Sequence, residues 1–163
     1  MSSRRRRVLV AKIRHFRALP DGTKYWLVPA WLLLGLGRAA IVVIPVRYLA
    51  YSLGARCGPY PWVPLIDVKQ QQRANTIARA LVVASRYTPW QSNCFPQAIA
   101  ASILLRSSGL PYTLFLGVAR GDSETRYVAH AWVTSGRVCV AGGRSFGRFT
   151  VVETFASHQL VAP

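Results

Sequence analysis

The stretch "CFPQAIAASILLRSSGLPYTLFLGVAR" (residues 94–120) decides the fold, because it joins a predicted buried helix directly to a predicted strand. Pro96 suits the first turn of a helix, and Gly109 is placed to end it. Residues 94–109 are apolar nearly all round, which predicts a helix that is covered on every side. Residues 112–120 then read as a strand. We therefore expect this helix to pack against the sheet that follows it.

Three further segments extend the predicted sheet. Residues 126–135 and 137–142 have the composition and alternation of strands. A hairpin loop at 121–125 and a tight turn at 135–136 connect them to their neighbours. Residues 149–156 add a fourth strand or an edge segment. Helices followed by a meandering antiparallel sheet define the α+β class.

A second helix is predicted over residues 67–86. Its apolar residues recur at positions 74, 77, 78, 81 and 82, the spacing of an amphipathic helix. Asp67 stands at the expected N-cap. Residues 87–93 then form a loop that leads into Cys94.

The first third of the chain reads as a helical accessory region. Residues 4–18 predict a basic helical arm, and residues 23–53 a helical segment. Residues 54–64 contain three prolines and two glycines, which indicates a linker. We therefore divide the chain into a basic helical N-terminal region, 1–58, and a core, 59–163.

Residues 25–46 raise the question of a membrane span. A spanning helix needs about 20 apolar residues, and this stretch reaches that length only with Arg38 near its middle. A charge at that depth is costly. No small-residue cleavage site of a secretory signal follows the stretch. One or two buried or membrane-grazing helices are therefore favoured over a span.

The charge and the cysteines limit the partners and the compartment. The chain has 21 Lys+Arg against 5 Asp+Glu, a formal net charge of +16, which favours acidic peptides, nucleic acid or anionic membranes. No nucleic-acid-binding motif accompanies the charge, so nucleic acid is not an expected partner. The three cysteines have neither disulfide nor zinc spacing. A cytoplasmic location is expected, with the inner face of the membrane left open.

Two residues carry the candidate chemistry, Cys94 and His130. Cys94 opens a helix, where free N–H groups favour the thiolate, the nucleophilic form. The alternative is a small buried apolar residue, which we expect of Cys57 and Cys139. His130 lies in the middle of a strand, where an isolated histidine is usually structural.

These residues lie in motifs that resemble a known family. "NCFPQAIAASILLRSSGLPYTLFLGVAR" (93–120) and "YVAHAWV" (127–133) are similar to the leader-peptidase B proteins of lasso-peptide biosynthesis, a branch of the transglutaminase-like cysteine proteases. The resemblance implies Cys94 as the nucleophile and His130 as its base, on a catalytic helix packed against the sheet. The backbone N–H of Cys94 and the amide of Gln91 are the expected oxyanion donors. No cofactor and no metal are implied.

The same resemblance implies a substrate and partners. The substrate is a ribosomally made precursor peptide, which is cut between its leader and its core. A separate ATP-using cyclase then joins the freed core amine to an acidic side chain. Residues 1–60 read as helices rather than as a winged leader-recognition domain, so a separate leader-recognition protein is an expected partner. Peripheral association with a membrane is left open.

One departure from the family pattern stands out. The family has an acid about a dozen residues after the histidine, where this chain has "VCVAGG" (138–143), with Ala141 and Gly142 at the expected position. Glu153 is the remaining downstream acid and is the predicted third member. A backbone carbonyl is the alternative group to hold the imidazole.

This departure keeps two other functions open. The first is a non-catalytic or impaired transglutaminase-like scaffold in the same maturation complex. The second is acyl transfer to an amine instead of hydrolysis.

Overall fold

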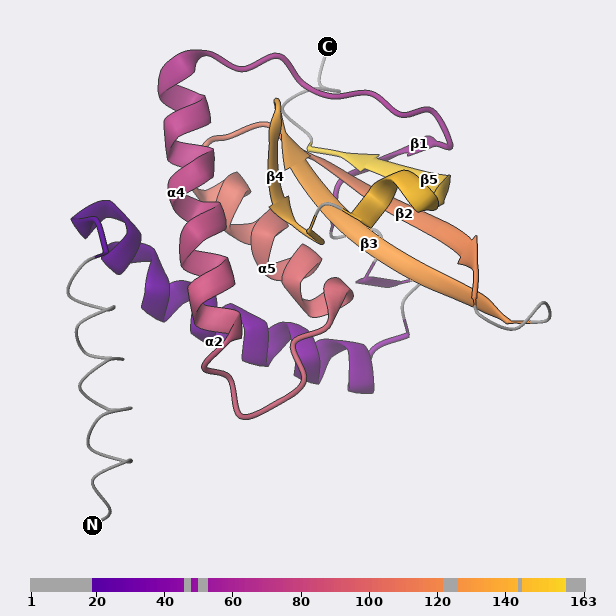
Figure 1. Ribbon diagram of the computed structural model, residues 1–163, viewed down its shortest axis with the longest axis horizontal. Helices are drawn as coiled ribbons and strands as arrows, with labels where there is room; N and C mark the ends of the chain where they lie inside the picture. Colours follow the sequence, from indigo (N-terminus) through magenta and orange to yellow (C-terminus); the bar gives the residue numbers. More distant parts are fainter. Residues whose placement is uncertain (1–18, 46–47, 50–52, 122–125, 144, 158–163) are drawn as a thin grey trace.

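The computed structural model describes residues 19–45, 48–49, 53–121, 126–143 and 145–157. The first described helix is followed by an antiparallel sheet with two further long helices, so the predicted α+β class is confirmed (Figure 1). The basic arm predicted at 4–18 and residues 122–125 of the predicted hairpin loop lie outside the described residues. In chain order the elements are α2 (Asp21–Val43), β1 (Ala55–Gly58), α4 (Val68–Ser85), α5 (Cys94–Ser107), β2 (Thr113–Arg120), β3 (Tyr127–Ser135), β4 (Val138–Ala141), the 3-10 helix η1 (Ser145–Arg148) and β5 (Thr150–Ala156).

The sheet has five antiparallel strands in the order β1-β5-β2-β3-β4. Strands β2 and β3 pair without a break from Thr113↔Thr134 to Arg120↔Tyr127. β5, which the sequence predicted as a strand or an edge segment, lies inside the sheet between β1 and β2. The sheet therefore grows on both sides of the β2–β3 hairpin.

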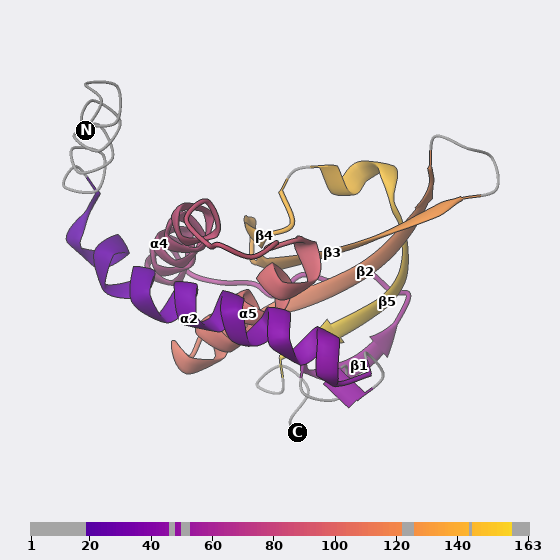
Figure 2. The ribbon, with the colours of Figure 1, turned by 90° about the horizontal axis from the view of Figure 1, so that it is seen from below.

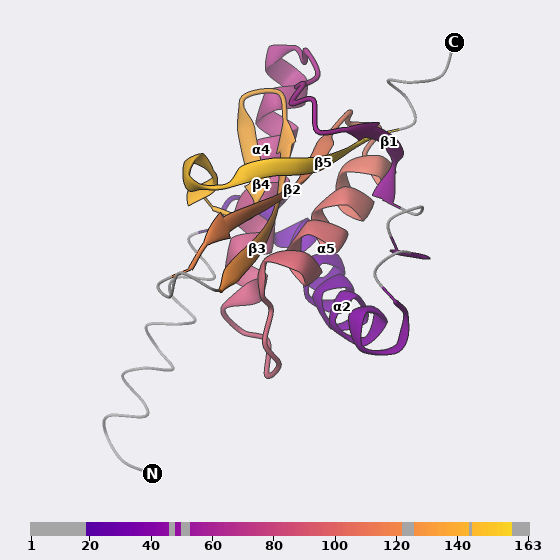
Figure 3. The same cartoon turned by 90° about the vertical axis from the view of Figure 1, so that its right-hand side faces the viewer.

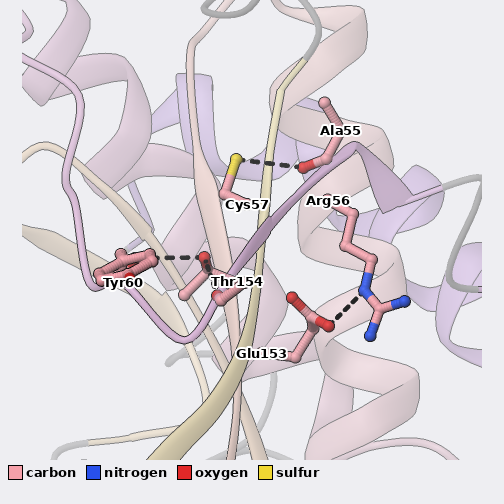
Figure 4. Close-up of polar contacts among 7 residues, drawn as sticks. Ala55, Arg56, Cys57, Tyr60, Glu153 and Thr154 are labelled. Atoms are coloured by element: carbon pink, nitrogen blue, oxygen red, sulfur yellow. Dashed lines mark hydrogen bonds and ion pairs between the residues drawn. The ribbon is translucent and has the colours of Figure 1, made fainter.

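Strand β1 corrects the prediction of a linker at 54–64. Residues 55–58 pair with β5, with Arg56 opposite Phe155. Thr154 Oγ1 donates to Gly58 O at 2.7 Å, which fastens the end of the strand. The same hydroxyl also lies 3.2 Å from Tyr60 O (Figure 4). Glycine and proline content did not reveal this pairing, because the partner strand lies near the other end of the chain. The domain boundary at 58/59 stays a prediction, and the strand just before it belongs to the sheet.

Helix α4 begins at the predicted cap. Asp67 Oδ1 accepts a hydrogen bond from Gln70 N at 2.8 Å, and Asp67 N donates to Gln70 Oε1 at 3.0 Å. This reciprocal pair is a capping box, which satisfies two N–H groups that have no partner inside the helix. The buried face differs slightly from the predicted stripe, because Ala80 is buried and Val82 is 47% exposed.

Helix α5 lies between the sheet and α2 (Figure 3). This position explains why it is apolar on nearly all sides. At the crossing with α2, a Cβ on Gly37 would lie 3.2 Å from Pro96 O, so the glycine allows α2 to approach the first turn of α5. The helices cover one face of the sheet, and η1 lies on the opposite side (Figure 2).

Helix α2 runs for 23 residues with Pro29 inside it, and it ends before Pro45, where Ile44 is extended. By length and composition it is able to cross a membrane. Part of it is packed in the protein instead, through Thr23, Leu27, Ala30, Leu34 and Gly37.

Candidate active site

Cys94 is the first residue of α5 and is half-buried against the core. The loop before it is held by its own polar groups. Thr88 Oγ1 lies 2.8 Å from Ser92 Oγ, and Gln97 Nε2 donates to Ser92 O at 2.7 Å. The first N–H groups of a helix have no partner inside it. The backbone N–H of Cys94 is therefore suited to bind an oxyanion beside the thiol.

Helix α2 fixes the position of this loop. The rings of Trp31 and Trp90 lie 4.8 Å apart, and Trp31 Nε1 donates to Tyr87 O at 3.3 Å. A Cβ on Gly35 would lie 2.9 Å from the Trp90 ring, so only glycine permits this contact. Trp90 thus packs against α2. The predicted oxyanion residue Gln91 is exposed, and no described residue hydrogen-bonds to its side-chain amide.

His130 lies in β3 opposite Gly117. Its ring stacks on Phe149 at 4.7 Å and on Trp132 at 5.9 Å. His130 Nε2 lies 2.8 Å from Gly142 O. Gly142 has φ +92°, and a Cβ there would lie 2.4 Å from Trp132 Cβ, so only glycine brings this carbonyl to the imidazole.

This contact defines the tautomer of His130. A carbonyl oxygen only accepts hydrogen bonds, so Nε2 carries the proton and donates a hydrogen bond to Gly142 O. In the neutral imidazole, Nδ1 then keeps its lone pair and is the basic atom. The Gly142 carbonyl thus lies where the family pattern has an acid. Sequence reasoning named a backbone carbonyl as an alternative, but side chains alone did not indicate which one.

The structure does not bring Glu153 to His130. The carboxylate Oε2 of Glu153 pairs with Arg56 Nε instead, and Oε1 is buried without a hydrogen-bond partner among the described residues (Figure 4). Glu153 lies opposite Leu116, which packs against the helix-side core. Phe155, two residues further on, belongs to the same core, so Glu153 faces the helices.

Cys94 and His130 lie on adjacent elements, but their side chains point to different sides of the sheet. Ala131 and Val133 pack in the core with α5. Because successive strand residues point to opposite faces, His130 and Trp132 share the face away from α5. Within the part of the chain that the structure describes, no hydrogen bond joins the Cys94 thiol to His130. A reaction between them requires the imidazole to reach the helix side of the sheet, which a side-chain rotation alone does not achieve.

The other two cysteines turn toward carbonyls of their own segments. Cys57 Sγ lies 3.4 Å from Ala55 O, and Cys139 Sγ lies 3.0 Å from Gly143 O. Both are half-buried and neither is in a disulfide. They differ from Cys94 in that neither opens a helix.

A cysteine that opens a buried helix, packed on an antiparallel sheet that carries a histidine, has the arrangement expected of a transglutaminase-like fold. A family model described as the transglutaminase-like superfamily matches residues 40–154. That match covers more than half of the chain, and the chain therefore belongs to this superfamily, which includes cysteine proteases. No curated protein and no solved structure matches the chain.

Proposed function

We propose that this chain is a cysteine peptidase that removes the leader from a ribosomally made lasso-peptide precursor. One observation carries the proposal. Cys94 opens the buried helix α5, and the neighbouring strand presents His130 with its Nε2 hydrogen-bonded to Gly142 O at 2.8 Å. Membership of a superfamily that includes cysteine proteases supports the reaction type. The resemblance of residues 93–120 and 127–133 to leader peptidases supports the substrate class.

The reaction follows from these groups. Nδ1 of His130 takes the thiol proton of Cys94, and the thiolate attacks the scissile carbonyl. The N–H of Cys94 stabilises the oxyanion. The imidazolium protonates the leaving amine of the core peptide, and a thioester remains on Cys94. Water, deprotonated by His130, then hydrolyses the thioester to release the leader as a carboxylate and to restore the thiol.

The separation of thiol and imidazole makes this peptidase dependent on its partners. His130 must leave its ring contacts with Trp132 and Phe149, and its part of β3 must shift to bring the imidazole to Cys94. In this proposal, a leader-recognition protein delivers the precursor, and their binding favours the shifted strand. The cyclase then uses the freed core amine. All three steps take place in the cytoplasm, where the ribosomal precursor and ATP are found.

The test is leader removal by the full chain. We expect wild-type protein, co-expressed with the precursor and recognition protein of its own gene neighbourhood, to yield a leader with a free carboxylate by mass spectrometry. Cys94→Ala is expected to abolish cleavage, and Cys57→Ala, as the matched control, to retain it. Cleavage by Cys94→Ala at the wild-type rate would show that the proposal is wrong. An amide-linked leader would indicate acyl transfer instead.

The opposite orientation of His130 favours one alternative, a non-catalytic scaffold. Alkylation by iodoacetamide at neutral pH separates the two functions, because Cys57 and Cys139 serve as internal references. A peptidase predicts that Cys94 reacts faster than both references when precursor and recognition protein are bound, and that His130→Ala removes the difference. A scaffold predicts no preference for Cys94 in either state.

A further inference from the structure

Helix α2 has two apolar faces, and the protein covers one of them. The inner face packs on α4 and α5 through residues such as Leu27 and Leu34. On the outer face, six large apolar side chains are each 51–78% exposed: Tyr25, Val28, Leu32, Leu36, Val42 and Val43. A helix on the surface of a soluble domain normally has charged residues on its outer side.

Charge is nearly absent from this stripe. Between Tyr25 and Val43, the sequence of α2 has one charged residue, Arg38, which is half-buried. At 1.5 Å per residue the stripe is about 28 Å long. The one acid of α2, Asp21, accepts a hydrogen bond from Lys24 Nζ at 2.8 Å, and this contact lowers the pKa of Asp21. Apolar surfaces of this extent usually mark contacts with a protein or a membrane.

Positive charge lies at one end of the stripe. Lys69 and Arg73 of α4 line a groove of about 420 Å³ together with Tyr25 and Trp26. Arg73 Nη2 donates to Ser108 O at 2.8 Å, which fixes the guanidinium at the rim. Residues 1–18 add seven arginines and lysines to the sequence immediately before α2. An apolar helix face flanked by basic residues is the pattern of an interfacial helix on anionic lipid.

Packing favours a helix that lies in the membrane plane over one that spans it. A span would have to separate Leu27, Ala30 and Leu34 from α4 and α5 and leave their core partners uncovered. A helix lying flat buries only its outer face and keeps those contacts. Tyr25 and the partly exposed Trp31 are the aromatic residues that favour the interface.

We propose that α2 docks flat on an anionic lipid bilayer through its outer face, with Lys69 and Arg73 at the lipid phosphates. The proposal does not rest on the peptidase function. It accounts for the apolar stripe and for part of the net charge of +16, neither of which cleavage of a peptide bond requires.

Flotation of the purified full chain with vesicles tests this docking. We expect wild-type protein to float with phosphatidylcholine–phosphatidylglycerol vesicles and much less with phosphatidylcholine vesicles. Leu32→Glu/Leu36→Glu is expected to lower the partition coefficient by about tenfold or more. The matched control is Val63→Glu/Leu65→Glu, which makes the same charge change at residues that are 47% and 98% exposed outside α2. The loss of vesicle binding in the control is expected to be at most half of the loss in the α2 variant.

A second pair, Lys69→Glu/Arg73→Glu, tests the electrostatic contribution separately from the burial of apolar side chains. It is expected to weaken binding to anionic vesicles at low salt. Circular dichroism melting verifies that each variant is folded, and Val28→Ser/Leu36→Ser is a milder pair if the glutamates unfold the helix.

The proposal fails if wild-type protein does not float with anionic vesicles, or if Leu32→Glu/Leu36→Glu and the control Val63→Glu/Leu65→Glu reduce flotation equally. It also fails if alkaline carbonate does not release the protein, because that would indicate a span. Self-association through Leu32 and Leu36 without vesicle binding would identify a second copy as the occupant instead.

Discussion

The two faces of the sheet differ in composition and in what they hold. The face toward α5 carries Leu114, Ala131 and Val133, which are closed in the apolar core. The opposite face carries His130 among the aromatic rings of Trp132 and Phe149, with a glycine carbonyl at its ring nitrogen. The first face is a rigid support for the helix that begins at Cys94. The second face holds an imidazole by two ring contacts and one hydrogen bond, which a local movement can break.

This difference shows how the fold separates stability from chemistry. The candidate nucleophile, Cys94, lies at the start of the buried helix α5, so its backbone N–H has a fixed place. The candidate base lies on the less covered face, held by stacking and one hydrogen bond. Changes on the helix side should therefore alter the free energy of unfolding, and changes on the other side should alter reactivity.

The largest effect is expected on the helix side. Leu105 is fully buried in α5, and Leu105→Ala should lower the free energy of unfolding by about 2–5 kcal/mol, because it leaves a cavity. The measurement is urea denaturation followed by circular dichroism. Ile103→Ala, at a position 43% exposed on the same helix, is the control and should cost about 1 kcal/mol or less. Equal losses in both variants would contradict the division between the faces.

The next effect concerns the carbonyl that holds His130. Gly142→Ala places a Cβ 2.4 Å from Trp132 Cβ and 2.7 Å from Ala131 O, so the carbonyl must move. We expect the rate of leader cleavage to fall about 100-fold, since a shift of about 1 Å in a catalytic group has that effect. Gly143→Ala is the matched control, because Gly143 also has positive φ (+68°) but has no atom within 4 Å of the added Cβ. Similar losses in both would show that backbone strain, and not the Gly142 carbonyl, matters.

A smaller loss of unfolding free energy is expected when the ion pair of Arg56 and Glu153 is broken. Arg56→Ala leaves the buried carboxylate of Glu153 without its partner and should cost roughly 1–3 kcal/mol of unfolding free energy. Glu153→Gln should change stability but leave the pH dependence of cleavage as in wild type, because Glu153 faces the helices and His130 does not. A shifted pH profile in Glu153→Gln would return Glu153 to the role of third member.

The smallest effect is expected at Phe149. Its ring stacks on His130 at 4.7 Å, and such pairs contribute about 0.5–1.5 kcal/mol beyond their buried area. Phe149→Leu should loosen the imidazole with a loss of stability of about 1 kcal/mol. NMR of the His130 ring, with alkylation of Cys94, measures both consequences. An imidazole with unchanged ring shifts would indicate that Trp132 and Gly142 hold it without Phe149.

Local patterns in the sequence were enough for most of the fold. Asp67 was recognisable as a cap because it stands at the start of an amphipathic pattern, and α5 was recognisable from Pro96, Gly109 and its apolar composition. The strands followed from alternation and turn residues. Strand β1 was missed because "ARCG" has no pattern of its own, and its strand character comes from pairing with β5.

The candidate site was predictable in its residue types but not in its geometry. Cys94 and His130 could be selected from motif and position. The side of the sheet to which His130 points could not be predicted. It depends on which residues of β3 meet α5 in the folded core. Gly142 gave no signal, since a backbone carbonyl has no side chain to mark it.

The sequence by itself determined the α+β class, the cysteine at the start of a buried helix, and the absence of an acid in "VCVAGG", because each depends on local periodicity or residue identity. Only the tertiary structure decided that Gly142 O holds His130, that Glu153 pairs with Arg56, and that α2 leaves an apolar face uncovered. These three depend on which segments meet, and long-range contacts of this kind are set by the packing of the whole chain.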